Sequence, residues 1–131
     1  MGPLFWFCSS VGATVACLIV VVITGVCGKI AVHIPFVAAT LLSLAVTIAL
    51  AIKLGAVYDL KAAGAITPIH KTIAMLATLS YALPLITGIR TLKSREHRRM
   101  HFRAAMFVLF MTAAASVTGT LMVLWSPKIV P

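Results

Sequence analysis

Four long apolar runs dominate the sequence and restrict what the chain can fold into. They cover residues 4–27, 34–52, 72–89 and 104–125. At about 1.5 Å of rise per residue, each run is long enough as a helix to cross a hydrocarbon core about 30 Å thick. Backbone groups in lipid are satisfied only within helices or closed barrels, and these runs lack the alternation of barrel strands. The sequence therefore predicts an all-α integral membrane protein with four transmembrane helices.

The composition excludes the soluble classes of protein. Of the 131 residues, 62% are hydrophobic and 10% are charged, whereas a soluble domain carries roughly 25% charged residues. A soluble globular domain and a disordered chain are both excluded. The net charge of +9 suits nucleic-acid binding in a soluble protein, but here the basic residues flank apolar runs. We therefore expect membrane lipid, and no nucleic acid, as a partner.

The connections between the runs predict the topology. They are short, so consecutive helices are expected to be antiparallel neighbours in a single four-helix up-down-up-down bundle over residues 1–131. In the third run, Pro84 lacks the N–H that a helix needs, which predicts a kink near Ser80 and Tyr81.

The basic residues predict the orientation in the membrane. The links that follow the first and third runs share one membrane face and carry seven basic residues: Lys29, Arg90, Lys93, Arg95, Arg98, Arg99 and Arg103. The other face carries four: Lys53, Lys61, Lys71 and Lys128. Because basic loops are retained in the cytoplasm, we expect the Arg-rich link there and both termini outside, in a bacterial inner membrane.

The histidines are the residues that point to chemistry. His33 opens the second apolar helix and His101 opens the fourth, so helix parity places both at the same membrane face and at one level. Two neutral imidazoles that face each other across a helical bundle are the ligands of a low-spin b-type haem. The alternative is that each histidine is only a polar residue at the membrane boundary.

The residues that follow each histidine support the haem interpretation. Ala105 and Thr112 share a helix face with His101, and Thr40 shares a face with His33. Small side chains leave room for a porphyrin, and threonine hydroxyls bond to the helix or to an imidazole N–H. Three nearby basic residues are predicted to pair with the haem propionates, namely Arg98, Arg99 and Lys29.

A third histidine is expected to lie apart from this pair. His70 opens the third helix, on the order of 25–30 Å from the other face by helix rise. Together with Lys71 it is a candidate for binding a quinone carbonyl, or for holding a second haem with a sulfur ligand such as Met122. The alternative for this pair is two interfacial side chains that reach toward the headgroups.

Two stretches resemble small bacterial four-helix membrane families that are related in pattern to the cytochrome b-561 type. One is His101-Phe-Arg-Ala-Ala-Met-Phe-Val-Leu-Phe followed by Thr112 through Val117-Thr-Gly119, and the other is His70-Lys-Thr-Ile-Ala-Met-Leu. The resemblance covers roughly residues 30–125 and implies electron transfer through a haem b held by histidines on alternate helices. It also implies a quinone or a partner redox subunit as the exchange partner.

The chain departs from the two-haem pattern of that type. Only His33 and His101 match a complete ligand pair, because the first helix has no histidine to complete a site with His70. The expected function is thus a single-haem cytochrome subunit that relays electrons within a larger membrane redox complex. The alternative is a non-catalytic structural or assembly subunit. Transport and hydrolysis are disfavoured, because no acidic residue lies at membrane depth and no base accompanies the serines.

Overall fold

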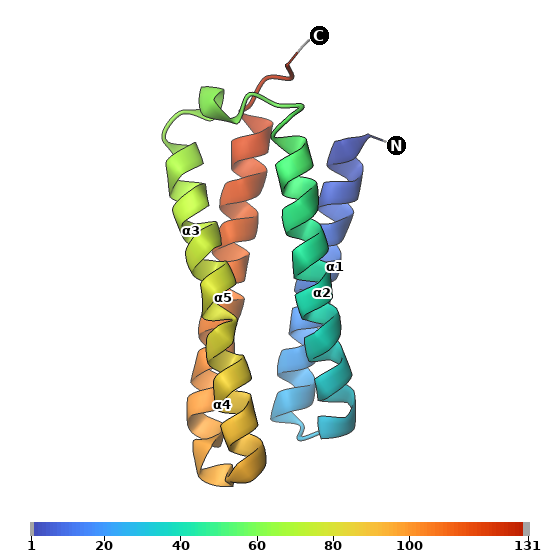
Figure 1. Cartoon of the computed structure of the whole chain (residues 1–131), viewed down its shortest axis with the longest axis vertical. Coiled ribbons are helices and arrows are strands. Elements are labelled where there is room, and N and C mark those ends of the chain that lie inside the picture. The colour runs from blue at the N-terminus through green and yellow to red at the C-terminus, as the bar shows by residue number, and fades with distance from the viewer. Residues whose placement is uncertain (1, 130–131) are drawn as a thin grey trace. The chain divides into compact units, whose positions relative to one another are not determined.

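The computed structural model of the chain describes residues 2–129, and its regular elements are helices (Figure 1). They are α1 (Pro3–Val26), α2 (Ile30–Leu54), α3 (Ile66–Ser80), α4 (Ala82–Lys93) and α5 (Arg98–Leu124), with short 3-10 turns at Leu60–Ala63 and Arg95–His97. Four stretches are long and apolar enough to span a membrane: α1, α2, Ile66–Lys93 and Arg95–Leu124. The predicted all-α class with four membrane-length helices is confirmed.

Three helices begin earlier than the apolar runs that predicted them. The starts are Ile30, Ile66 and Arg98, where the apolar runs gave residues 34, 72 and 104. An apolar run marks only the part of a helix that crosses the hydrocarbon core. The helical hydrogen bonds of the backbone continue into the polar residues that flank the run. Of the three histidines expected at helix starts, His33 and His101 therefore lie in the first turns of α2 and α5, and His70 lies at the start of the second turn of α3.

The distribution of side chains is the reverse of that in a water-soluble protein. Large apolar residues lie outside, and Leu42, Ile52 and Phe110 each expose at least 70% of their surface. The buried polar residues are all hydroxyl side chains: Thr14, Thr24, Thr40, Thr67, Ser80, Thr87, Thr112 and Ser126. Soluble proteins bury aliphatic residues and expose polar ones. This arrangement fits a surface solvated by lipid.

The chain divides into two compact units, of which the first is Met1–Gly64 with Met122–Pro131. Its main feature is the antiparallel hairpin of α1 and α2 (Figure 1). Gly28 has a φ of 69°, a left-handed conformation that glycine adopts without strain and that ends α1. The tight turn that results brings the end of α1 against the start of α2.

Hydroxyl groups join the two helices of this hairpin at mid-length. The Thr14 hydroxyl lies 2.8 Å from that of Ser43 and 3.1 Å from that of Thr47, which in turn is 2.6 Å from the Ser10 hydroxyl. Interhelical hydroxyl contacts between small residues are a common means of joining membrane helices. The hairpin is thus held by polar contacts as well as by packing.

Substitution of Thr14 by valine is expected to loosen this hairpin. Valine keeps the shape of the side chain but removes the hydroxyl that connects Ser43 with Thr47, so the free energy of unfolding should fall by about 1 kcal/mol. The matched control is Thr78→Val, because the exposed Thr78 hydroxyl bonds only the Ala74 carbonyl of its own helix. Thermal unfolding in detergent checks the difference, and equal midpoints for the two variants would contradict the interpretation.

The C-terminal residues complete the first unit. The Ile129 N–H donates to the Val57 carbonyl at 2.9 Å, and the Asp59 N–H donates to the Pro127 carbonyl at 3.0 Å. Beside these bonds lies a small apolar core of Leu54, Tyr58 and Val123. Residues 127–129 are therefore tied to the segment that follows α2.

The second unit, Ala65–Leu121, contains α3, α4 and most of α5. The helical path from α3 into α4 is interrupted at Tyr81, where the Pro84 ring provides no N–H for the Ser80 carbonyl four residues before it. The predicted kink is confirmed. At the interruption the Tyr81 hydroxyl lies 3.0 Å from the Thr112 hydroxyl of α5, which ties the bend to the neighbouring helix.

Candidate histidine ligand sites

His33 lies in the first turn of α2 and packs against the last turns of α1. Its Nδ1 is 2.9 Å from the Val21 carbonyl oxygen and 3.3 Å from the Thr24 hydroxyl. A carbonyl oxygen only accepts, so Nδ1 carries the proton and donates it. In this tautomer the lone pair of the neutral ring is on Nε2.

His101 lies in the first turn of α5 and contacts the end of α4 in the same way. Its Nδ1 is 3.2 Å from the Thr87 hydroxyl. That hydroxyl donates its own proton to the Leu83 carbonyl at 2.7 Å, so its oxygen is left to accept from the imidazole. Nδ1 of His101 is therefore also the protonated nitrogen, and Nε2 carries the lone pair.

His70, near the start of α3, repeats the arrangement against the end of α5. Its Nδ1 is 3.1 Å from the Thr118 hydroxyl, which donates to the Ala114 carbonyl at 2.8 Å. The ring also bonds the backbone of Ala115. Ala115 stands three residues before Thr118, as Val21 stands three residues before Thr24. The same tautomer follows, with the lone pair on Nε2.

Each of the three threonines is followed by a glycine on which the imidazole ring rests. A Cβ at Gly25 would lie 3.1 Å from Cε1 of His33, one at Gly88 3.3 Å from Cε1 of His101, and one at Gly119 2.8 Å from Cε1 of His70. We call Thr24–Gly25, Thr87–Gly88 and Thr118–Gly119 the Thr–Gly pairs. In each, the hydroxyl fixes the ring nitrogen and the missing side chain lets the ring approach the helix.

The fourth histidine is of a different kind. His97 lies in the 3-10 turn between α4 and α5, and no Thr–Gly pair contacts it in the structure as described. It is therefore a natural control for substitutions of the other three. Among residues 2–129, no group of three or more His, Cys, Asp or Glu side chains is arranged to hold a metal ion.

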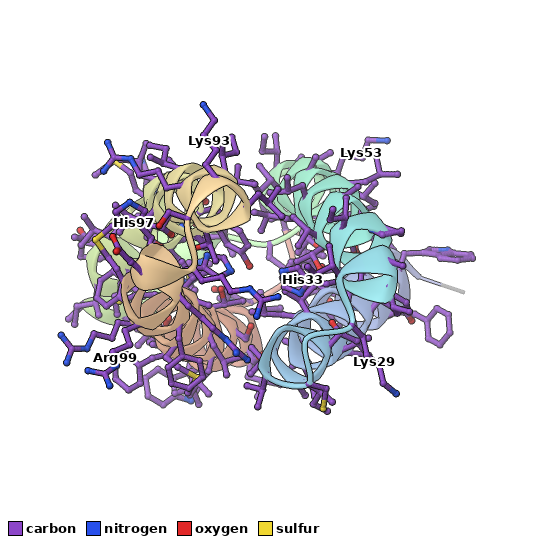
Figure 2. All side chains as sticks on the ribbon, turned by 90° about the horizontal axis from the view of Figure 1, so that it is seen from below. Lys29, His33, Lys53, Lys93, His97 and Arg99 are labelled. Atoms are coloured by element: carbon purple, nitrogen blue, oxygen red, sulfur yellow. The ribbon has the colours of Figure 1, made fainter. Side chains whose placement is uncertain are left out.

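The predicted propionate partners lie at the loop ends of the two units. Lys29 precedes α2, and Arg98 and Arg99 open α5, and all three are exposed. Figure 2 shows the Lys29 and Arg99 side chains pointing away from their helices. They are placed to meet anionic groups at the membrane surface.

The remaining predicted site residues have other contacts. Thr40 is buried and donates to the Phe36 carbonyl at 2.7 Å, the bond back to the helix that was expected. The Thr112 hydroxyl of α5 contacts the Tyr81 hydroxyl, so the Thr112 side chain faces the junction between α3 and α4. Ala105 is partly buried and Lys71 is exposed.

The Thr–Gly pairs are the feature that the sequence analysis missed. Gly119, for example, accommodates the His70 ring. A signal was present: the tripeptide Ile-Thr-Gly occurs at residues 23–25 and 86–88, and a similar Val-Thr-Gly occurs at 117–119. The first of these tripeptides lies in α1 and the second in α4. In both cases the next long helix has a histidine near its start, which is His33 in α2 and His101 in α5.

Comparisons with family models, with curated proteins and with solved structures find no match for the chain.

Proposed function

We propose that the chain is a membrane b-type cytochrome subunit in which His33 and His101 are the axial ligands of one haem. The observation that carries the proposal is the acceptor held against Nδ1 of each ring, which is the Val21 carbonyl for His33 and the Thr87 hydroxyl for His101. A histidine that ligates a metal through Nε2 almost always donates its Nδ1 proton to a carbonyl or another acceptor, which orients the ring and strengthens the ligand. Both imidazoles are held in this state by the preceding helix.

Topology supports the pairing of these two histidines. Each stands in the first turn of a helix that follows a link, and with four consecutive spans the two links emerge on the same membrane face. This helix parity supports a common membrane level for the two imidazoles in the proposed site. Arg98, Arg99 and Lys29 belong to the same level, where their charges suit the haem propionates.

Two imidazole ligands define the chemistry of the site. A haem held by His33 and His101 would supply electron transfer rather than oxygen binding. The protein's part would be to present Nε2 of each ring as a ligand and to keep the Nδ1 protons on their acceptors. We propose that electrons pass between this haem and a quinone or a redox subunit of a larger membrane complex.

An absorption spectrum of the purified protein tests the proposal directly. Protein produced in a haem-sufficient host and purified in mild detergent should show a Soret band, and dithionite should sharpen the visible bands as in a low-spin b haem. Protein that is folded but colourless, and that remains so after incubation with hemin, would contradict the cytochrome assignment. The non-catalytic structural or assembly subunit would then be the better description.

The orientation of the chain has a separate test. Positive charge favours a cytoplasmic location for the link that contains Ser94, and the opposite face for Ala63. In a background with Cys8, Cys17 and Cys27 replaced by alanine, a cysteine at position 94 should resist membrane-impermeant maleimide in intact cells, and one at position 63 should react. The reverse pattern would invert the topology and place the haem near the outer surface.

A further inference from the structure

We infer that the Arg-rich end of the second unit is a binding surface for the phosphate groups of anionic phospholipids. The surface, which we call the Arg-rich surface, consists of six exposed basic residues: Arg90, Lys93, Arg95, Arg98, Arg99 and Arg103. The inference goes beyond the proposed electron transfer and does not depend on it, because the proposed haem uses only Arg98 and Arg99 of this set.

Arginine, and not only positive charge, is concentrated at this end. The sequence contains five arginines, all within residues 90–103, whereas its six lysines are distributed over both ends of the helices. The rule that retains basic loops in the cytoplasm counts lysine and arginine alike, so it explains the charge but not the choice of side chain. A guanidinium differs from an ammonium in its planar set of donors, which can bind a phosphate through parallel hydrogen bonds. The segregation of arginine therefore indicates recognition of an oxyanion.

The Arg-rich surface contains basic pairs that repel each other. Arg90 and Lys93 stand three residues apart in the last turn of α4, and Arg99 and Arg103 stand four residues apart at the start of α5. Residues at these spacings are neighbours on one helix face, where like charges destabilise the helix. Glu96 is the single carboxylate of this segment, so six basic residues against one acidic residue leave a net charge of +5. Anions from outside the segment would offset this repulsion.

The Arg-rich surface lies at the depth of the lipid headgroups. The two membrane-length stretches of the second unit meet here, one ending at Lys93 and the next beginning at Arg95. The hydrogen bond between His101 and Thr87 sets a common level for the two helices. Lys93 lies about 9 Å from this level toward the link, and Arg103 about 3 Å toward the bilayer centre. This band covers a headgroup layer of roughly 5–8 Å, which the Arg103 guanidinium reaches along its own apolar stem.

Apolar side chains between the basic ones indicate that the ligand is a lipid. Ile89 and Leu92 of α4 and Phe102 of α5 each expose at least 47% of their surface. Figure 2 shows the Lys93 and Arg99 side chains pointing away from the helices. Cations and exposed apolar groups thus alternate on the same helix ends. A phospholipid matches both, because its phosphate meets the cations while its acyl chains cover the apolar groups. Clusters of four to eight basic residues beside a membrane span commonly bind anionic lipids in this way.

The test is a comparison of lipids on the whole protein. Native mass spectrometry from a mild detergent measures the lipids retained per chain during titration with phosphatidylglycerol, phosphatidylcholine or oleate. Phosphatidylglycerol should bind most tightly, because phosphatidylcholine carries no net charge and oleate offers a carboxylate in place of a phosphate. Inorganic phosphate should not displace phosphatidylglycerol, because it has no acyl chains to cover the apolar groups.

Three arginines that the proposed haem does not use provide the variants, namely Arg90, Arg95 and Arg103. Their combined replacement by glutamine should weaken the binding of phosphatidylglycerol about tenfold or more, since each basic residue near an anionic surface contributes a factor of roughly five. Replacement of the same three by lysine keeps the charge and should remove the preference for phosphatidylglycerol over oleate. The matched control replaces three exposed lysines of the opposite membrane face by glutamine and should leave the binding unchanged: Lys53, Lys61 and Lys128.

Several outcomes would overturn the inference. One is equal retention of phosphatidylglycerol and phosphatidylcholine by the wild-type protein, which needs no variant to fold. Others are equal losses in the two glutamine variants, or a lysine variant that keeps the preference for phosphatidylglycerol over oleate. Displacement by inorganic phosphate would assign the surface to a soluble anion instead of a lipid. The haem spectrum plays no part in these measurements, so failure of the proposed function and failure of this inference are distinguishable.

Discussion

Replacement of His33 or of His101 by alanine is expected to abolish the low-spin haem signal while the protein still inserts in the membrane. In the proposed site each ring would be one of two imidazole ligands, so the loss of either would end bis-imidazole coordination. The helices themselves depend on their apolar length and not on these rings. The measurement is the reduced-minus-oxidised spectrum, normalised to protein purified from the membrane fraction.

Two controls sharpen this experiment. His97→Ala removes a histidine from the same link, but one without a Thr–Gly pair, and should leave the spectrum unchanged. Thr87→Ser keeps the hydroxyl that accepts from His101, whereas Thr87→Val removes it. Serine should therefore preserve the haem potential, and valine should change it. Retention of the low-spin spectrum by both alanine variants would remove His33 and His101 as ligands.

Gly119→Ala is expected to have the largest effect of any single added methyl group. The new Cβ would lie 2.8 Å from Cε1 of His70, closer than nonbonded carbon atoms approach. The ring must leave Thr118, or α3 must move away from α5. Overpacking of this kind costs about 1–3 kcal/mol of the free energy of unfolding. Chemical or thermal unfolding in detergent measures it.

A double-mutant cycle identifies the cause of that loss. If the added methyl group clashes with the imidazole, then most of its cost should vanish in the His70→Ala background, and the coupling energy should exceed about 0.5 kcal/mol. Gly12→Ala is the matched control, because nothing lies within 4 Å of its Cβ position. That variant should be neutral or slightly stabilising, since alanine favours a helix. If the effects of Gly119→Ala and His70→Ala on the free energy of unfolding are additive, the strain lies elsewhere on α5.

The sequence predicted the number and class of the helices because lipid imposes a simple rule. A run such as residues 34–52 has to cross the membrane as a helix, and Pro84 has to interrupt one. Both features depend on local properties of the chain and both were confirmed. Helix ends were less predictable, because Ile66 and Arg98 lie in polar flanks where hydropathy no longer reports on helical hydrogen bonding.

The histidine supports were not predicted, because they depend on how one helix is rotated against another. His33 and Thr24 meet only because the Gly28 turn sets the register of α2 on α1. Thr87 is one of several threonines in its span, and its sequence does not show that its hydroxyl faces His101. The available signal was the tripeptide Ile-Thr-Gly, which occurs before His33 and again before His101. Its role becomes clear only in the structure, where the turn between the helices brings each threonine to the imidazole.

The sequence separation between each imidazole and its hydrogen-bond partners determines the order in which these contacts can form during synthesis. The His33 contacts span at most 12 residues and the His101–Thr87 contact spans 14, whereas His70 and Thr118 are 48 residues apart. Contacts between residues close in sequence form early, since little loop entropy is lost in closing them. During synthesis from the N-terminus, His33 is oriented once the first hairpin has inserted. His70 has to wait, after its own helix has emerged, until nearly all of α5 is in the bilayer. The His33 imidazole is thus oriented long before the His70 imidazole.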